Sequence, residues 1–105
     1  MRKDVRTLLS RIDRSKLQTN TQKVLYRLLN SENEWISRST IKVPSVGSRL
    51  RDLRKEQYGA FEVECTTARK LRKRTRAATN HPTFYRLKSS SVTCKKVASI
   101  FKGVI

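Results

Sequence analysis

The order of sequence patterns between residues 45 and 87 constrains the fold of this chain more than any other feature. An arginine-rich segment with apolar residues at helical spacing is followed by Gly59, which suits a left-handed helix stop. Residues 60–65 and 83–87 then read as two strands. This order predicts a helix that packs against a hairpin. The side chains expected to be buried are Val46, Leu50, Leu53, Phe61, Val63 and Cys65, with Phe84 or Tyr85 from the second strand.

Helices are also expected on both sides of this segment. Apolar residues recur at helical spacing over residues 2–17 and again over residues 92–104. Another helix is expected to begin with a cap at Asn20 or Thr21 and to run to Leu29. The two terminal helices each have an apolar stripe that must be covered, either by the domain itself or by a second subunit.

The chain between the second and the main helix contains shorter signals. The apolar pair Trp35-Ile36 predicts a brief first strand, and Ser37 is a good N-cap for a short helix over residues 38–43. Pro44 ends that helix, and Ser45 is expected to cap the main helix over residues 45–56.

The length of 105 residues is enough for one domain and too short for two. We therefore expect a single domain over residues 1–105, with an N-terminal helix in 1–18, a core in 20–87 and a C-terminal helix in 91–104. No secretory signal follows Met1, and no segment approaches the ~20 apolar residues that span a bilayer. A cytosolic location is the expectation.

The charge of the chain predicts a polyanionic partner. Lys and Arg number 25 and Asp and Glu number 8, so the formal net charge is +17. All acids lie between Asp4 and Glu64, and the chain from Cys65 onward has eleven basic residues and no acid. Nucleic acid is the first candidate partner and an anionic membrane surface is the second.

Several segments together resemble the winged helix-turn-helix domains of bacteriophage and mobile-element proteins. They are Val24–Leu29, Trp35-Ile36-Ser37, Ser48–Glu56, Tyr58-Gly59, Phe61-Glu62-Val63 and Phe84–Leu87. The resemblance implies an α+β, mainly α fold: a winged helix-turn-helix with a two-stranded β-wing and additional N- and C-terminal helices. It further implies sequence-specific binding of double-stranded DNA by a transcription regulator, a replication initiator's origin-binding domain or a nuclease-targeting module. The location that it implies is the cytoplasm or nucleoid of a bacterial host. The chain departs from the pattern at Gln57-Tyr58 and in its long basic connection.

The face of the main helix opposite its apolar stripe is the candidate base-reading surface, because arginine pairs bidentately with guanine in the major groove. A solvated helix face is the alternative, and the serines can equally serve as caps. The candidate base contacts are Ser45, Ser48, Arg51, Asp52 and Lys55.

Cations beside this face and in the hairpin connection are the candidate contacts to the DNA backbone. They are Arg38, Arg49, Arg54, Arg69, Lys70, Arg72, Lys73, Arg74 and Arg76. Arg49 or Arg54 can instead pair with Asp52 or Glu56, and Lys23 and Arg27 are further backbone candidates or plain surface residues. The connection over residues 66–82 is expected either to become ordered on DNA or to form helical turns within Ala68–Ala78.

Neither a metal site nor catalysis is expected. Structural zinc needs four closely spaced ligands, which His81, Cys65 and Cys94 do not supply, and no nucleophile–base pair or glycine-rich phosphate loop is present. We therefore predict a binding protein without a cofactor, and a homodimer through the terminal helices. Two other readings remain open at this point: a basic RNA-binding protein, and a phage protein that binds a host protein.

Overall fold

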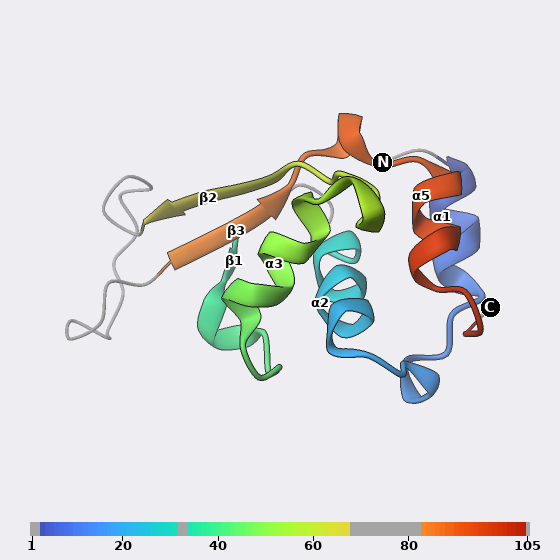
Figure 1. Cartoon of the computed structure of the whole chain (residues 1–105), viewed down its shortest axis with the longest axis horizontal. Helices are drawn as coiled ribbons and strands as arrows, with labels where there is room; N and C mark the ends of the chain where they lie inside the picture. The colour runs from blue at the N-terminus through green and yellow to red at the C-terminus, as the bar shows by residue number, and fades with distance from the viewer. Residues whose placement is uncertain (1–2, 32–33, 68–82, 105) are drawn as a thin grey trace.

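The chain is an α+β domain with a three-stranded antiparallel sheet (Figure 1). The structure is a computed structural model that describes residues 3–31, 34–67 and 83–104. The helices are α1 (Lys3–Ser10), α2 (Asn20–Leu29), α3 (Val46–Arg54) and α5 (Cys94–Ile100). The strands are β1 (Ile36–Ser37), β2 (Val63–Thr67) and β3 (Thr83–Leu87). Short 3-10 helices lie at Arg14–Lys16, Arg38–Thr40, Glu56–Tyr58 and Ser89–Ser91.

The sheet has the strand order β1-β3-β2, with β3 in the middle. Tyr85 of β3 lies opposite Ile36 of β1 on one side and Cys65 of β2 on the other. Strand β3 has the predicted bounds, and β1 lies one residue beyond the predicted Trp35-Ile36 pair. The hairpin of β2 and β3 extends away from the helices (Figure 1).

Helices α2 and α3 pack against one another beside this sheet. Leu25 of α2 and Leu50 and Leu53 of α3 have at most 2% of their surface exposed, and Phe61 joins them at 1%. The predicted apolar stripe of the main helix is therefore confirmed. Both candidates in β3, Phe84 and Tyr85, are buried, each with 8% of its surface exposed. Tyr85 belongs to this core, which Ile36, Val63 and Leu87 continue along the sheet.

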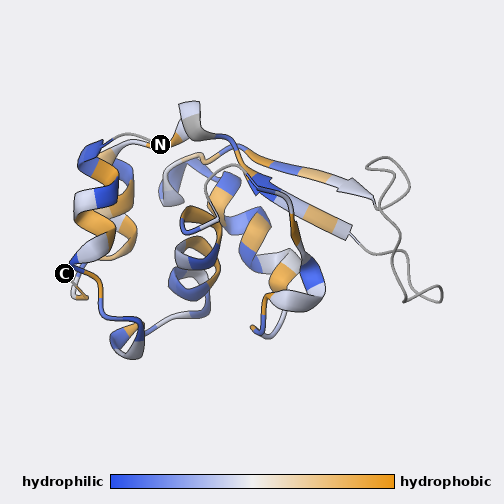
Figure 2. Cartoon of the chain, turned by 180° about the vertical axis from the view of Figure 1, so that it is seen from behind, coloured by the Kyte–Doolittle hydropathy of each residue, from blue (hydrophilic) through white to orange (hydrophobic). Residues whose placement is uncertain are grey.

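Helices α1 and α5 lie side by side at the end of the molecule away from the hairpin (Figure 1). Val5 of α1 and Val97 and Phe101 of the α5 segment are completely buried, and Figure 2 shows apolar residues along both helices. Phe101 meets the ring of Tyr26 edge to face, with 6.5 Å between ring centroids. Both terminal stripes are thus covered within one chain and belong to the common core.

The terminal helices are shorter than the apolar periodicity predicted, and side chains near their ends form local caps. Helix α1 ends at Ser10, and the Asp13 carboxylate accepts a hydrogen bond from the Ser15 amide to begin a 3-10 turn. Helix α5 begins only after Thr93, whose hydroxyl accepts from the Lys96 amide. Ile12 and Val104 remain buried although they lie outside these helices.

The predicted side-chain caps of α2, of the segment after Ser37 and of α3 were all wrong. Thr19, rather than Asn20 or Thr21, caps α2 through a capping box with Gln22. The side-chain Nε2 of Gln22 also donates to the Ile100 carbonyl at 3.0 Å. Ser37 makes no side-chain cap, and the predicted helix over 38–43 is only the turn Arg38–Thr40. Pro44 explains part of this shortening, because a proline disfavours helical backbone in the residue before it.

Ser45 precedes α3 but does not cap it through its side chain. Its backbone is left-handed, with φ 54° and ψ 47°, whereas a capping serine needs extended backbone to bring its hydroxyl to the helix amides. The structure therefore assigns Ser45 a backbone role, turning the chain into α3.

The exit from α3 differs from the prediction in its details. Gly59 is left-handed as predicted, with φ 102°, and Ala60 follows with φ 48°. These two residues redirect the chain so that the Phe61 amide donates to the Leu53 carbonyl at 2.8 Å. Strand β2 consequently begins at Val63 instead of residue 60, and Cys65 is exposed because it lies on the extending hairpin.

We predict that Gly59→Ala lowers the free energy of unfolding by about 1–3 kcal/mol, because a Cβ costs energy in left-handed backbone. The added Cβ would also lie 2.9 Å from Phe61 Cε2. Chemical denaturation followed by the fluorescence of Trp35, the single tryptophan, measures the change.

Gly47→Ala is the matched control, since its Cβ would come no closer than 3.7 Å, to Arg38 Nη2. It should be neutral or stabilising by up to about 1 kcal/mol. Equal destabilisation by both substitutions would contradict this account of the turn.

Candidate nucleic-acid interface

The exposed side of α3 is defined by the burial of its other side. Val46, Leu50 and Leu53 face the core, which turns Ser48 and Arg51 outward. The Arg51 side chain is exposed, and its Nη2 lies 3.2 Å from Ser48 Oγ. Among the described residues, this hydroxyl is the only side-chain group hydrogen-bonded to Arg51. The guanidinium of Arg51 can therefore exchange that contact for a ligand.

Asp52 was predicted to contact bases, but its carboxylate is engaged within the helix. Arg49 Nη2 lies 3.3 Å from one oxygen and Lys55 Nζ lies 3.4 Å from the other, and the Asp52 side chain is only 18% exposed. Arg49 thus adopts the alternative considered for it, an ion pair with Asp52. Lys55 remains 58% exposed, just beyond the C-terminal end of the helix.

Arg54 was a candidate for the DNA backbone, and the structure places its guanidinium against the protein. Arg54 Nη2 donates to the Val63 carbonyl at 2.8 Å. This bond joins the last turn of α3 to the first residue of β2. It therefore helps to fix the direction of the hairpin relative to the helix.

Arg38 lies close to the first turn of α3. A Cβ added to Gly47 would be 3.7 Å from Arg38 Nη2, which places the guanidinium beside the N-terminal end of the helix. Exposed cations thus lie beside the N-terminal end of α3, within it and just after it: Arg38 from the preceding 3-10 turn, Arg51 from the helix and Lys55 at its C-cap. The remaining predicted backbone contacts, Arg69, Lys70, Arg72, Lys73, Arg74 and Arg76, lie outside the described residues, as does the suggested helix within Ala68–Ala78.

The outer face of the sheet carries a cross-strand ladder that sequence reasoning missed. The Arg86 guanidinium lies 4.2 Å from the centre of the Trp35 ring and contacts Glu64 through Nε and Nη2, at 3.3 and 3.1 Å. Lys88 pairs with Glu62 nearby at 3.3 Å. The alternation of Glu62 and Glu64 signalled an outward face, but their partners depend on the register with β3. These acids therefore offset cations on the sheet, and among the described residues no acid is paired with Arg51 of α3.

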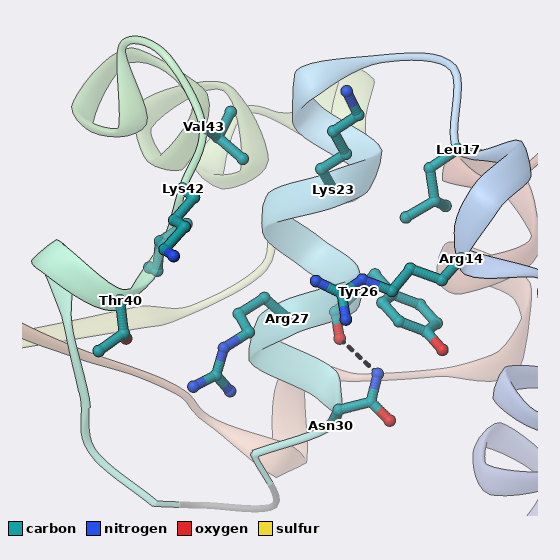
Figure 3. Close-up of a pocket in the computed structure, with 10 residues that line it drawn as sticks. Arg14, Leu17, Lys23, Tyr26, Arg27, Asn30, Thr40, Lys42 and Val43 are labelled. Atoms are coloured by element: carbon teal, nitrogen blue, oxygen red, sulfur yellow. Dashed lines mark hydrogen bonds between the residues drawn. The ribbon is translucent and has the colours of Figure 1, made fainter.

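A second basic surface lies on α2. Lys23, Tyr26, Arg27 and Asn30 recur at helical spacing on the side of α2 that faces away from Val24 and Leu25, and they line an open groove (Figure 3). The sequence singled out Lys23 and Arg27 only as further candidate contacts to the DNA backbone or as plain surface residues. The other wall of the groove, at residues 40–43, could not be anticipated because it depends on the path of the chain before α3.

Among the described residues, no group of three metal-binding side chains is brought together. Cys65 and Cys94 are both free thiols, and His81 lies outside the described segments. In the same part of the chain, no helix has both the length and the apolar character required to cross a bilayer.

The different surroundings of Arg51 and Arg54 predict that the two substitutions affect stability to different extents. Arg54→Ala should lower the free energy of unfolding by about 1 kcal/mol, because it removes the hydrogen bond to Val63. Arg51→Ala should change it by less than about 0.5 kcal/mol, as expected for an exposed helix position. Denaturant unfolding of the two variants measures both values, and a larger loss for Arg51→Ala would refute these assignments.

Comparison with protein-family models, curated proteins and solved structures finds no match to this chain.

Proposed function

We propose that this chain binds double-stranded DNA in a sequence-specific manner as a winged helix-turn-helix protein. The element order supports this: α2, a short strand, a 3-10 turn, α3 and an antiparallel hairpin follow one another as expected for that class. The inclusion of β1 in the sheet beside β3 supports it as well. In this proposal α3 enters the major groove and the hairpin approaches the adjacent backbone.

The observation that carries the proposal is the exposed cationic side of α3. Arg51 projects from a helix whose opposite side is anchored in the core, so its position is set by packing rather than by a loop. Asp52, the acid nearest to it in sequence on this helix, is neutralised by Arg49 and Lys55. Arginine on a rigid helix is well suited to the O6 and N7 acceptors of guanine.

A DNA-binding protein and an RNA-binding protein would differ in their need for this side of α3. The major groove of A-form RNA is too deep and narrow to admit a helix, so an RNA-binding protein of this charge would not need the outer side of α3. The proposal therefore ties function to particular residues and not only to the net charge of +17.

A dimer is no longer needed to cover the terminal helices. Val5, Val97 and Phe101 are completely buried within one chain. The homodimer stays a prediction, but it no longer has the support of two uncovered apolar stripes. The proposed setting is a phage or mobile element, as a regulator or as the origin-binding domain of a replication initiator.

Arg51→Ala should weaken binding to the sequence that the wild-type chain prefers by about 1–3 kcal/mol and relax the preference at one base pair. Fluorescence anisotropy with labelled duplexes, each carrying one substituted base pair, measures both effects. The matched control is Lys95→Ala, which removes one exposed cation from α5 at the other end of the molecule.

Lys95→Ala should weaken all duplexes by the same small amount, since it changes only the long-range charge. Equal weakening of preferred and random duplexes by Arg51→Ala would show that Arg51 does not read a base.

A further inference from the structure

An open groove of about 720 Å³ lies on the outer side of α2 (Figure 3). Three segments form it: the turn before α2, α2 itself with its C-cap, and the connection from the 3-10 turn to α3. We call it the α2 groove. Its lining residues are Arg14, Leu17, Lys23, Tyr26, Arg27, Asn30, Thr40, Ile41, Lys42 and Val43.

Within the described part of the chain, the charged groups that line the α2 groove are all positive. They come from all three segments and are Arg14, Lys23, Arg27 and Lys42. Arg14, Lys23 and Lys42 are exposed, and no acidic partner is assigned to them within the described residues. Arg27 is oriented by its Nη1, which donates to Ser31 Oγ at 2.8 Å. The groove therefore favours an anionic occupant.

The space between these cations is apolar. Leu17, Tyr26 and Val43 are partly buried and pack on the core, and Ile41 is 5% exposed. The Tyr26 ring packs edge to face against the ring of Phe101. The phosphate groups of a nucleic acid would gain no binding energy from aliphatic side chains such as Leu17 and Val43. The apolar side chains of a peptide would gain binding energy there, because the contact removes them from water.

We propose that the α2 groove is the docking site for an acidic amphipathic segment of a partner protein. Its apolar side chains contact Leu17, Tyr26 and Val43, and its carboxylates face the surrounding cations. A second copy of this chain is a poor occupant, because each copy has a net charge of +17 and only 8 acids. The proposal does not rest on DNA binding, because none of the lining residues is a candidate base contact of α3 and only Lys23 and Arg27 are also candidate contacts to the DNA backbone.

The test uses three fluorescent peptides of about 15 residues, long enough for a short helix. The first has leucines at helical spacing and glutamates elsewhere. The second has the same composition in scrambled order, and the third has glutamine in place of each glutamate. Anisotropy titrations at about 0.15 M salt compare their affinities for the wild-type chain. The first peptide should bind most tightly, because it alone combines charge with an apolar stripe.

Two double variants with the same net charge locate the site. Arg14→Glu with Lys42→Glu reverses two exposed cations of the groove that are not candidate DNA contacts, and Lys3→Glu with Lys95→Glu reverses two exposed cations of α1 and α5. The groove variant should weaken the first peptide about tenfold or more, and the control variant less than about threefold. The fluorescence of Trp35 confirms that both variants fold.

Equal weakening by the two variants, or equal affinity for the ordered and scrambled peptides, would overturn the proposal. The proposal would also be overturned if the groove variant weakened the binding of a labelled oligothymidine but not the binding of the first peptide. The groove would then be a site for single-stranded nucleic acid. Both variants are also titrated with duplex DNA. A loss of peptide binding in the groove variant alone, with equal duplex affinities in the two variants, separates this site from the DNA surface.

Discussion

The packing of α3 against α2 and Phe61 is the contact on which the rest of the structure depends. Burial of Leu50 and Leu53 fixes which side of α3 meets solvent, and so presents Arg51 outward. Two bonds at the end of the helix then set the path of the hairpin: the Phe61 amide to the Leu53 carbonyl, and Arg54 to the Val63 carbonyl. A surface built from a helix and a hairpin keeps its geometry only if the two elements are joined in this way.

The type and order of the main elements could be predicted from the sequence, because periodicity and turn residues report local structure directly. The strand Thr83–Leu87 and the left-handed Gly59 are examples. The caps could not be predicted, because several neighbouring Ser, Thr and Asn residues compete and tertiary contacts choose among them. Thr19 caps α2 where Gln22 can also reach the Ile100 carbonyl, which is 78 positions away in the sequence.

The candidate site was predictable as a helix face but not as a set of individual contacts. Helical spacing places Arg51 opposite the stripe, and the structure agrees. The role of Arg54 depends on where β2 begins, and this follows from the Gly59-Ala60 turn rather than from the helix. Asp52 shows a similar limit, since helical spacing allows its pairs with Arg49 and Lys55 without deciding between these pairs and base contact. Net charge alone indicates a polyanion, and the pairing of the acids shows which cations remain available.

The most direct test of sequence-specific DNA binding is the selection of bound sequences from a random double-stranded DNA library. The wild-type chain is used at about 0.15 M salt, with structured RNA present as competitor, so that binding driven by charge alone is suppressed. Enrichment of one compact motif is the predicted result. Failure to enrich any motif, together with loss of DNA binding to the RNA competitor, would contradict the proposal and leave only charge-driven association.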